Sequence, residues 1–276
     1  MEKKVNYNDD DLERIYDDFR TIKERRNLLI EKFVKHKCKD NRSSEYMTQG
    51  FSRRISTLAR CIDNIFSYLP PENNNVPEDN LRKDAEINLQ AFVFNVFGAI
   101  DNLAHICVFE LDIRKPNGNE LPASWVGLDK SNRQVRKGLS EGFSTFLVGF
   151  DEWLDLQSNY RHALAHRIPL YIARYAVPTK AAEKYEELSQ RITVMQKRMI
   201  ENISNTEEFW RLAGERKELE NAQLDLVHFR PTMIHSFTEN APEIIFHAQI
   251  LADFRTVEEI AECFLVEISE CRKVEL

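Results

Sequence analysis

Two histidines and two arginines lie close together between positions 159 and 169, in the segment Asn-Tyr-Arg-His-Ala-Leu-Ala-His-Arg-Ile-Pro. Histidine changes its protonation near neutral pH and can act as a general acid or base. Arginine stays charged and presents a planar fork of N–H donors that fits phosphate oxygens. The segment could therefore cleave RNA without a metal ion. His166 would move a proton, Arg161 would stabilise the charge that develops on the phosphate, and His162 would orient the site.

The spacing of arginine and histidine carries little weight by itself, because it occurs twice. Arg230 and His235 stand at the same separation, but Pro231 follows the arginine, and we treat that pair as a chance match. The first match differs in three ways: a polar residue directly follows its arginine, a helix that ends at Pro169 carries it, and polar side chains on a second predicted helix could support it. These supporting residues are Asp101, Asn102 and His105.

In this setting the segment from Arg161 to His166 resembles the hallmark of the HEPN superfamily (higher eukaryotes and prokaryotes nucleotide-binding). The hallmark is an arginine, a polar residue and, a few positions on, a histidine. The resemblance is specific over those six residues, and residues 1–175 share the general character of the family fold. It implies an antiparallel helical bundle, an RNA substrate, a homodimer with a composite site, and no metal or other cofactor. It also implies a toxin–antitoxin or phage-defence setting, with an antitoxin or defence protein as partner.

Other members of that superfamily are non-catalytic modules that bind nucleotides or proteins, and this is the alternative function. A purely structural interpretation is also open. Arg161 could pair with Asp155 or Asp101 near the end of its helix, and the two histidines could bridge helices by hydrogen bonds. A metal site is a third possibility, since His162 and His166 stand at i and i+4 and a third ligand could come from Asp101 or His105. The sequence lacks the glutamate of a His-Glu-x-x-His motif, so that signal is poor.

Further cations could extend a phosphate-binding surface. Arg167 follows the motif directly, and Arg133, Arg136 and Lys137 lie in the loop-rich connection that precedes the motif helix. For the last three, an ordinary solvated loop is the simpler interpretation.

Composition favours a globular, helical protein. Of the 276 residues, 42% are hydrophobic and 30% charged, and Gly and Pro number only 8 and 9. The net charge of −7 argues against a protein that coats nucleic acid, although a local basic groove remains compatible with it. The five cysteines form no Cys-x-x-Cys pair, the N-terminal segment is too polar for a signal peptide, and no apolar run approaches the length that crosses a bilayer. We therefore expect a cytoplasmic protein that does not contact a membrane.

Apolar residues at helical spacing predict amphipathic helices over residues 9–37 and 51–69, and from about residue 141 to the motif. Residues 77–112 should form the central helix of the core, because their middle part is apolar nearly all round. The expected fold is mainly α, with an antiparallel HEPN-like bundle over residues 1–175.

Residues 176–276 should form a C-terminal extension packed on that bundle. The charged stretch 179–220 has a coiled-coil-like apolar seam and predicts a long helical hairpin. Alternating apolar residues predict a β-hairpin with strands 233–238 and 243–254. A last helix should begin at Thr256, with Glu259 as the partner in a capping box.

Overall fold

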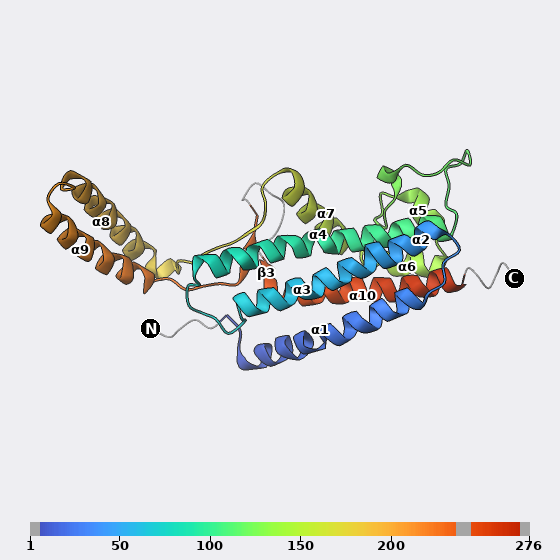
Figure 1. The fold of residues 1–276 in the computed structure, drawn as a ribbon, viewed down its shortest axis with the longest axis horizontal. Coiled ribbons are helices and arrows are strands. Elements are labelled where there is room, and N and C mark those ends of the chain that lie inside the picture. Colours follow the sequence, from blue (N-terminus) through green and yellow to red (C-terminus); the bar gives the residue numbers. More distant parts are fainter. Residues whose placement is uncertain (1–5, 236–243, 271–276) are drawn as a thin grey trace.

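Four long helices form the body of the molecule in the computed structural model, which describes residues 6–235 and 244–270 (Figure 1). They are α1 (Asp9–Lys35), α3 (Ser52–Tyr68), α4 (Asp79–Glu110) and α10 (Phe246–Glu270). The expectation of a mainly α protein is confirmed. The fourth helix of the bundle comes from the range that we expected to form the extension.

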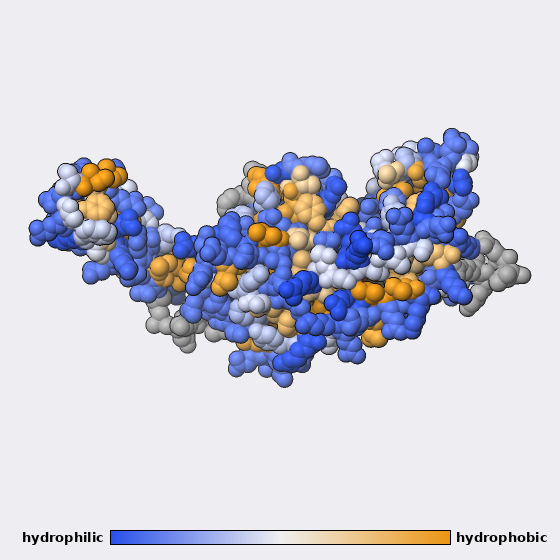
Figure 2. Space-filling model, viewed as in Figure 1, coloured by the Kyte–Doolittle hydropathy of each residue, from blue (hydrophilic) through white to orange (hydrophobic). Residues whose placement is uncertain are grey.

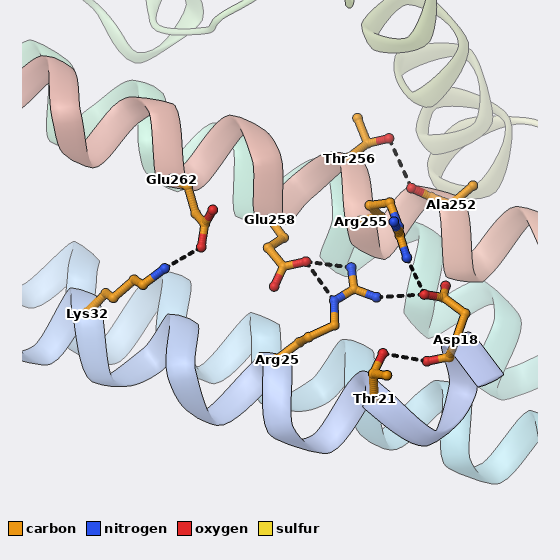
Figure 3. Close-up of polar contacts among 9 residues, drawn as sticks. All are labelled: Asp18, Thr21, Arg25, Lys32, Ala252, Arg255, Thr256, Glu258 and Glu262. Atoms are coloured by element: carbon orange, nitrogen blue, oxygen red, sulfur yellow. Dashed lines mark hydrogen bonds and ion pairs between the residues drawn. The ribbon is translucent and has the colours of Figure 1, made fainter. Parts of the chain in front are cut away.

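The bundle is antiparallel only in part. Phe19 stacks on Phe66 and Phe33 stacks on Phe51, so α3 runs opposite to α1. By contrast, α10 runs parallel to α1, because the ion pairs between the two helices advance together along both. Figure 3 shows these pairs: Arg25 with Glu258, Lys32 with Glu262, and Asp18 with both Arg25 and Arg255.

Local signals explain where α1 begins and which face it buries. The side chain of Asn8 accepts a hydrogen bond from the backbone N–H of Asp11 at 2.8 Å and caps the helix. Acidic residues fill the first turn and basic residues the last, which suits the helix dipole. The side chains that α1 buries follow the helical spacing seen in the sequence: Ile15, Ile22, Leu29 and Phe33.

Helix α3 is preceded without a break by α2 (Asn41–Glu45) and by a π-helical segment, η1 (Tyr46–Phe51). The buried carboxylate of Glu110, at the end of α4, accepts the backbone N–H groups of Lys39 and Asp40 and so holds the start of α2. A π-helical turn shifts the following residues around the helix axis. It therefore affects which side chains of α3 face α4.

The predicted central helix is confirmed as α4. It is longer and more apolar than a helix that is excluded from a membrane by length alone. By length and composition alone, α4 could cross a membrane, which corrects our expectation that no apolar run is long enough. Within its most apolar stretch, 67% of the residues are buried against neighbouring elements. This burial is the property of a core helix.

The helix expected to run from residue 141 to the motif is two helices. The first, α6 (Glu141–Val148), follows the short elements η2 (Ala123–Trp125) and α5 (Arg133–Lys137), and it ends at Gly149. The buried carboxylate of Glu267 accepts the N–H and hydroxyl of Ser140 and fixes the start of α6 on α10. The second helix, α7 (Asp151–His166), carries the motif and ends three residues before Pro169, as predicted.

After α7 the chain forms an antiparallel sheet of three short strands, β1 (Tyr171–Ile172), β2 (Thr232–Ile234) and β3 (Ile244–Ile245), in that order. Between β1 and β2 it leaves the body through η3 (Thr179–Ala181) and returns through the predicted helical hairpin, α8 (Ala182–Glu201) and α9 (Thr206–Leu224). Figure 1 shows the hairpin projecting from one end of the bundle. Near its tip, Figure 2 shows an apolar patch, where Ile200, Ile203 and Trp210 are exposed.

The predicted β-hairpin is wrong over most of its length. Residues 236–243, which include its turn, lie outside the described residues, and the second strand stops at Ile245. From Phe246 the chain is helical, and the side chains that it buries recur every three or four residues: Phe246, Ile250, Phe254, Val257. The apparent alternation reflects a helix that is apolar on more than one side. The predicted capping box is wrong for the same reason: Thr256 lies inside α10, and its hydroxyl donates to the carbonyl of Ala252 (Figure 3).

Two charged residues of α4 hold the chain where it leaves the motif. Arg82 donates to the carbonyl oxygen of Ile172 at 2.9 Å, and Glu86 accepts the N–H of the same residue at 3.1 Å. Arg82 and Glu86 also pair with each other at 3.2 Å, and both side chains are about nine-tenths buried. This clamp fixes β1 on α4, six residues after the end of α7.

Candidate functional site

The motif occupies the last turns of α7, where its three side chains have different surroundings. Arg161 is partly buried, and its guanidinium carbon lies 5.4 Å from the centre of the Phe97 ring on α4, a cation–π contact. His162 and His166 are exposed, and the centres of their rings are 6.1 Å apart. One arginine thus lies against α4, and the two histidines face solvent.

Helix α7 runs antiparallel to α4, which determines what each motif residue can meet. Arg161 lies at Phe97, whereas the carbonyl of Leu170 accepts a hydrogen bond from Gln90 at 2.7 Å. His166 lies between Arg161 and Leu170 in the chain, so it lies further along α4 than Arg161, on the side of Gln90. His105 lies eight residues beyond Phe97 in the opposite direction, about 12 Å along the helix. The structure brings Arg161 close to the supporting cluster, but within one chain it does not bring His166 to His105.

Asp101 is the member of the predicted cluster that faces Arg161. Burial raises the pKa of its carboxyl, and the charges of His105, Arg54 and Arg161 act in the opposite direction. His105, one turn further along, stacks on Tyr46 with ring centres 4.9 Å apart. Burial lowers the pKa of His105, against the attraction of Asp101. The cluster therefore favours a neutral imidazole at neutral pH.

The charge state of His162 follows from its neighbours. Partial burial lowers the pKa of its imidazole, and the positive charges of Arg161, His166 and Arg167 lower it further. A histidine that is neutral at neutral pH can accept a proton or orient a hydroxyl by a hydrogen bond. Arg167, the residue after α7, donates its backbone N–H to Ala163 and has an exposed side chain next to the histidines.

Asn102, the third supporting residue, points to a different helix. Its side-chain oxygen accepts a hydrogen bond from Nε of Arg54 on α3 at 3.0 Å, and Asn95 accepts from Nη1 of the same arginine at 3.2 Å. No sequence motif marked Arg54 as a site residue. A detectable signal was the spacing of two asparagines and a glycine, Asn95, Gly98 and Asn102, in the apolar middle of α4.

The cations expected to extend a phosphate surface lie at the other end of α7. Arg136 forms an ion pair with Asp151, the first residue of α7, at 2.6 Å and donates to the carbonyl of Leu128. Arg133 and Lys137 are exposed on the same short helix, α5. Asp151 and His166 are 15 residues apart, about 22 Å along a helix. These three cations are not brought together with the histidines.

No family model, curated protein or solved structure matches this chain. What bears on function is the geometry of the segment Arg161–His166 and of the α4 residues beside it.

Over residues 6–235 and 244–270, no group of three or more His, Cys, Asp or Glu side chains is placed to hold a metal ion. His162 and His166 lie together, but the third ligand considered from sequence, His105 or Asp101, lies further along α4 and faces Tyr46 or Arg161. The chemistry available at the site is that of imidazole, carboxyl and guanidinium groups.

A small cavity of about 60 Å³ separates α7 from α4 beside Asp101. It is lined by Asp101, Phe97 and Leu128, and by Gln157 of α7, whose side-chain oxygen is buried without a hydrogen-bond partner. The amide nitrogen of Gln157 donates to the buried carboxylate of Asp253 on α10 at 3.0 Å. Asp253 thus anchors α7 to the bundle at the level of the cavity.

The same carboxylate should make stability depend on pH. Asp253 accepts hydrogen bonds from three neutral donors, those of Trp153, Gln157 and Gln249. Burial raises its pKa from 3.8 to about 6. The native state therefore retains this proton when the unfolded chain has lost it. The free energy of unfolding should fall as pH rises from about 4 to 6, by up to about 3 kcal/mol from this group.

Asp253→Asn, which keeps an oxygen acceptor and cannot ionise, should remove that part of the pH dependence and raise stability at pH 7. Urea unfolding between pH 4 and 8 measures both effects, with the exposed Asp84→Asn as control. If Asp253→Asn lowered stability equally at every pH, the pKa of the carboxyl would be the same in the native and unfolded states, contrary to this prediction.

Proposed function

We propose that this protein is a metal-independent endoribonuclease of the HEPN type, active in the cytoplasm as a homodimer. One observation carries the proposal: the end of α7 exposes two histidines, His162 and His166, next to Arg161, which packs against α4. In such a site imidazole groups can move protons while the guanidinium binds phosphate oxygens. The setting we infer is toxin–antitoxin or phage defence, with an antitoxin or defence protein as partner.

The reaction follows from these groups. His166 takes the proton of a ribose 2′-hydroxyl as general base, and the 2′-oxygen forms a bond to the adjacent phosphorus. The bond from phosphorus to the 5′-oxygen breaks, and the departing oxygen takes a proton from water. His162 orients the site. Arg161 stabilises the charge that develops on the phosphate oxygens.

The homodimer is supported by the directions of the side chains. Arg161 lies against α4, whereas His166 faces solvent and lies displaced along α4, so a second copy could bring the two together at one phosphate. On α4, Ile87 and Phe94 each lie one turn before a residue that contacts the segment 161–170, namely Gln90 and Phe97. Ile87 and Phe94 are 62% and 39% exposed and lie seven residues apart on one stripe of the helix. Exposed apolar side chains at such spacing suit a contact between helices.

The wild-type protein should cleave single-stranded RNA in the presence of EDTA and leave 2′,3′-cyclic phosphate ends. The chelator should not change the rate, because no step uses a metal ion. Purified protein and end-labelled RNA, with products separated by gel and identified by mass spectrometry, provide the measurement. An inert protein that still binds nucleotide would favour the alternative, a non-catalytic HEPN-like module.

A further inference from the structure

Arg54 is partly buried, and within the described residues it pairs with no carboxylate, unlike three other inward-facing arginines. Arg25 pairs with Asp18 and Glu258, Arg82 with Asp79 and Glu86, and Arg136 with Asp151. Within the part of the chain that the structure describes, the partly buried Arg54 makes its side-chain hydrogen bonds only to the neutral side chains of Asn95 and Asn102. Its positive charge is therefore held in place without being neutralised by a direct ion pair.

The position of the guanidinium is fixed by the helix beneath it. Gly98 of α4 lies directly under the group, and a Cβ atom there would stand 2.4 Å from its central carbon. The two asparagine oxygens bind Nε and Nη1, which leaves the other N–H groups of the fork for a ligand. The fork is thus oriented before any ligand arrives, and this orientation reduces the entropy lost on binding.

Arg54 and Arg161 lie on either side of Asp101. Arg54 sits over Gly98 and Arg161 over Phe97, and both side chains act electrostatically on the Asp101 carboxyl. Over the described residues, Arg161 likewise forms no ion pair with a carboxylate. Two oriented guanidinium groups, supplied by α3 and α7, therefore border one face of α4, with a single carboxyl between them.

We propose that Arg54, held by Asn95 and Asn102, is a phosphate-binding residue that takes a backbone phosphodiester of single-stranded RNA close to the phosphate bound by Arg161. This inference rests on the proposed function, because it places a second phosphate of the substrate beside the motif. Arg54 binds and orients the strand, and it takes no part in proton transfer. An asparagine-held arginine recognises the charge and shape of the phosphate and carries no base specificity.

Binding is tested in the full-length protein with His166→Ala as background, so that RNA is not cut, using a fluorescent 20-nucleotide single strand. Adding Arg54→Gln should weaken binding about tenfold at 0.1 M KCl and reduce the slope of log affinity against log salt by about 0.7, the value for one phosphate contact on a single strand. Arg53→Gln, which changes the exposed neighbouring arginine, is the matched control and should alter affinity less than threefold. Equal affinity and slope for the two variants would overturn the proposal.

A second variant separates the position of the charge from its presence. Gly98→Ala should displace the Arg54 guanidinium from its position over α4 while the net charge stays the same. It should therefore weaken RNA binding as Arg54→Gln does. Circular dichroism and thermal unfolding confirm that each variant folds, and Gly98→Ala still decides the question if Arg54→Gln does not fold. Unchanged binding by a folded Gly98→Ala would contradict the oriented site.

Competition separates a backbone phosphodiester from free phosphate. Unlabelled RNA should displace the probe, and inorganic phosphate at equal ionic strength should not. Displacement by both would overturn the assigned ligand. The outcomes also separate this inference from the proposed function. Arg54-dependent binding in a protein that never cleaves RNA would support the phosphate site and reject the nuclease. RNA cleavage at an unchanged rate in Arg54→Gln would support the nuclease and reject the phosphate site.

Discussion

Replacing His166 by alanine should lower the rate of RNA cleavage by about 100-fold to 10,000-fold, the usual contribution of a general acid or base. The fold should not change, because His166 is exposed at the last residue of α7. Arg161→Ala should cause a loss of similar size by removing the charge that stabilises the transition state. The measurement is the single-turnover rate on end-labelled RNA in EDTA.

The control is Asn159→Ala, which changes an exposed side chain two turns earlier on the same helix and should leave the rate unchanged. Mixing Arg161→Ala with His166→Ala tests the composite site. If each site takes its arginine from one subunit and its histidine from the other, mixed dimers contain one intact site, and about a quarter of wild-type activity should return. No recovery after exchange of subunits would place both residues of a site in one chain. If neither single variant lowered the rate, the catalytic assignment would fail.

Replacing Glu86 by alanine should destabilise the protein by roughly 3–5 kcal/mol, the range observed when one partner of a buried ion pair is removed. Without Glu86, Arg82 retains the more exposed Asp79 as its one ionic partner among the described residues, and the buried N–H of Ile172 loses its acceptor. Urea denaturation at pH 7 gives the change in the free energy of unfolding.

Glu86→Gln should cost less than Glu86→Ala, because the amide oxygen can still accept from Ile172. Asp84→Ala removes an exposed carboxylate from the same turn of α4 and should change stability by less than about 0.5 kcal/mol. Equal effects of Glu86→Ala and Asp84→Ala would show that the clamp on β1 contributes nothing to stability.

Most helices could be predicted from the amino-acid pattern, because amphipathic spacing and end signals act within a few turns. The pattern of Ile15, Ile22 and Leu29 predicted the buried face of α1, and Pro169 predicted the end of α7. The charged hairpin α8–α9 was recognisable from its apolar seam. Local patterning failed at α10, where apolar residues on more than one side of a helix imitated strand alternation, and at Gly149, which divides α6 from α7.

Which side chains of the site meet depends on how the helices pack. Asp101 and Asn102 are adjacent in sequence, yet about 100° of helix rotation separates them, so one faces Arg161 on α7 and the other Arg54 on α3. The antiparallel course of α7 along α4 placed Arg161 beside Asp101 and moved His166 away from His105. These contacts join residues 48 or more positions apart in the chain. They depend on how whole helices pack against one another, and no local pattern encodes that packing.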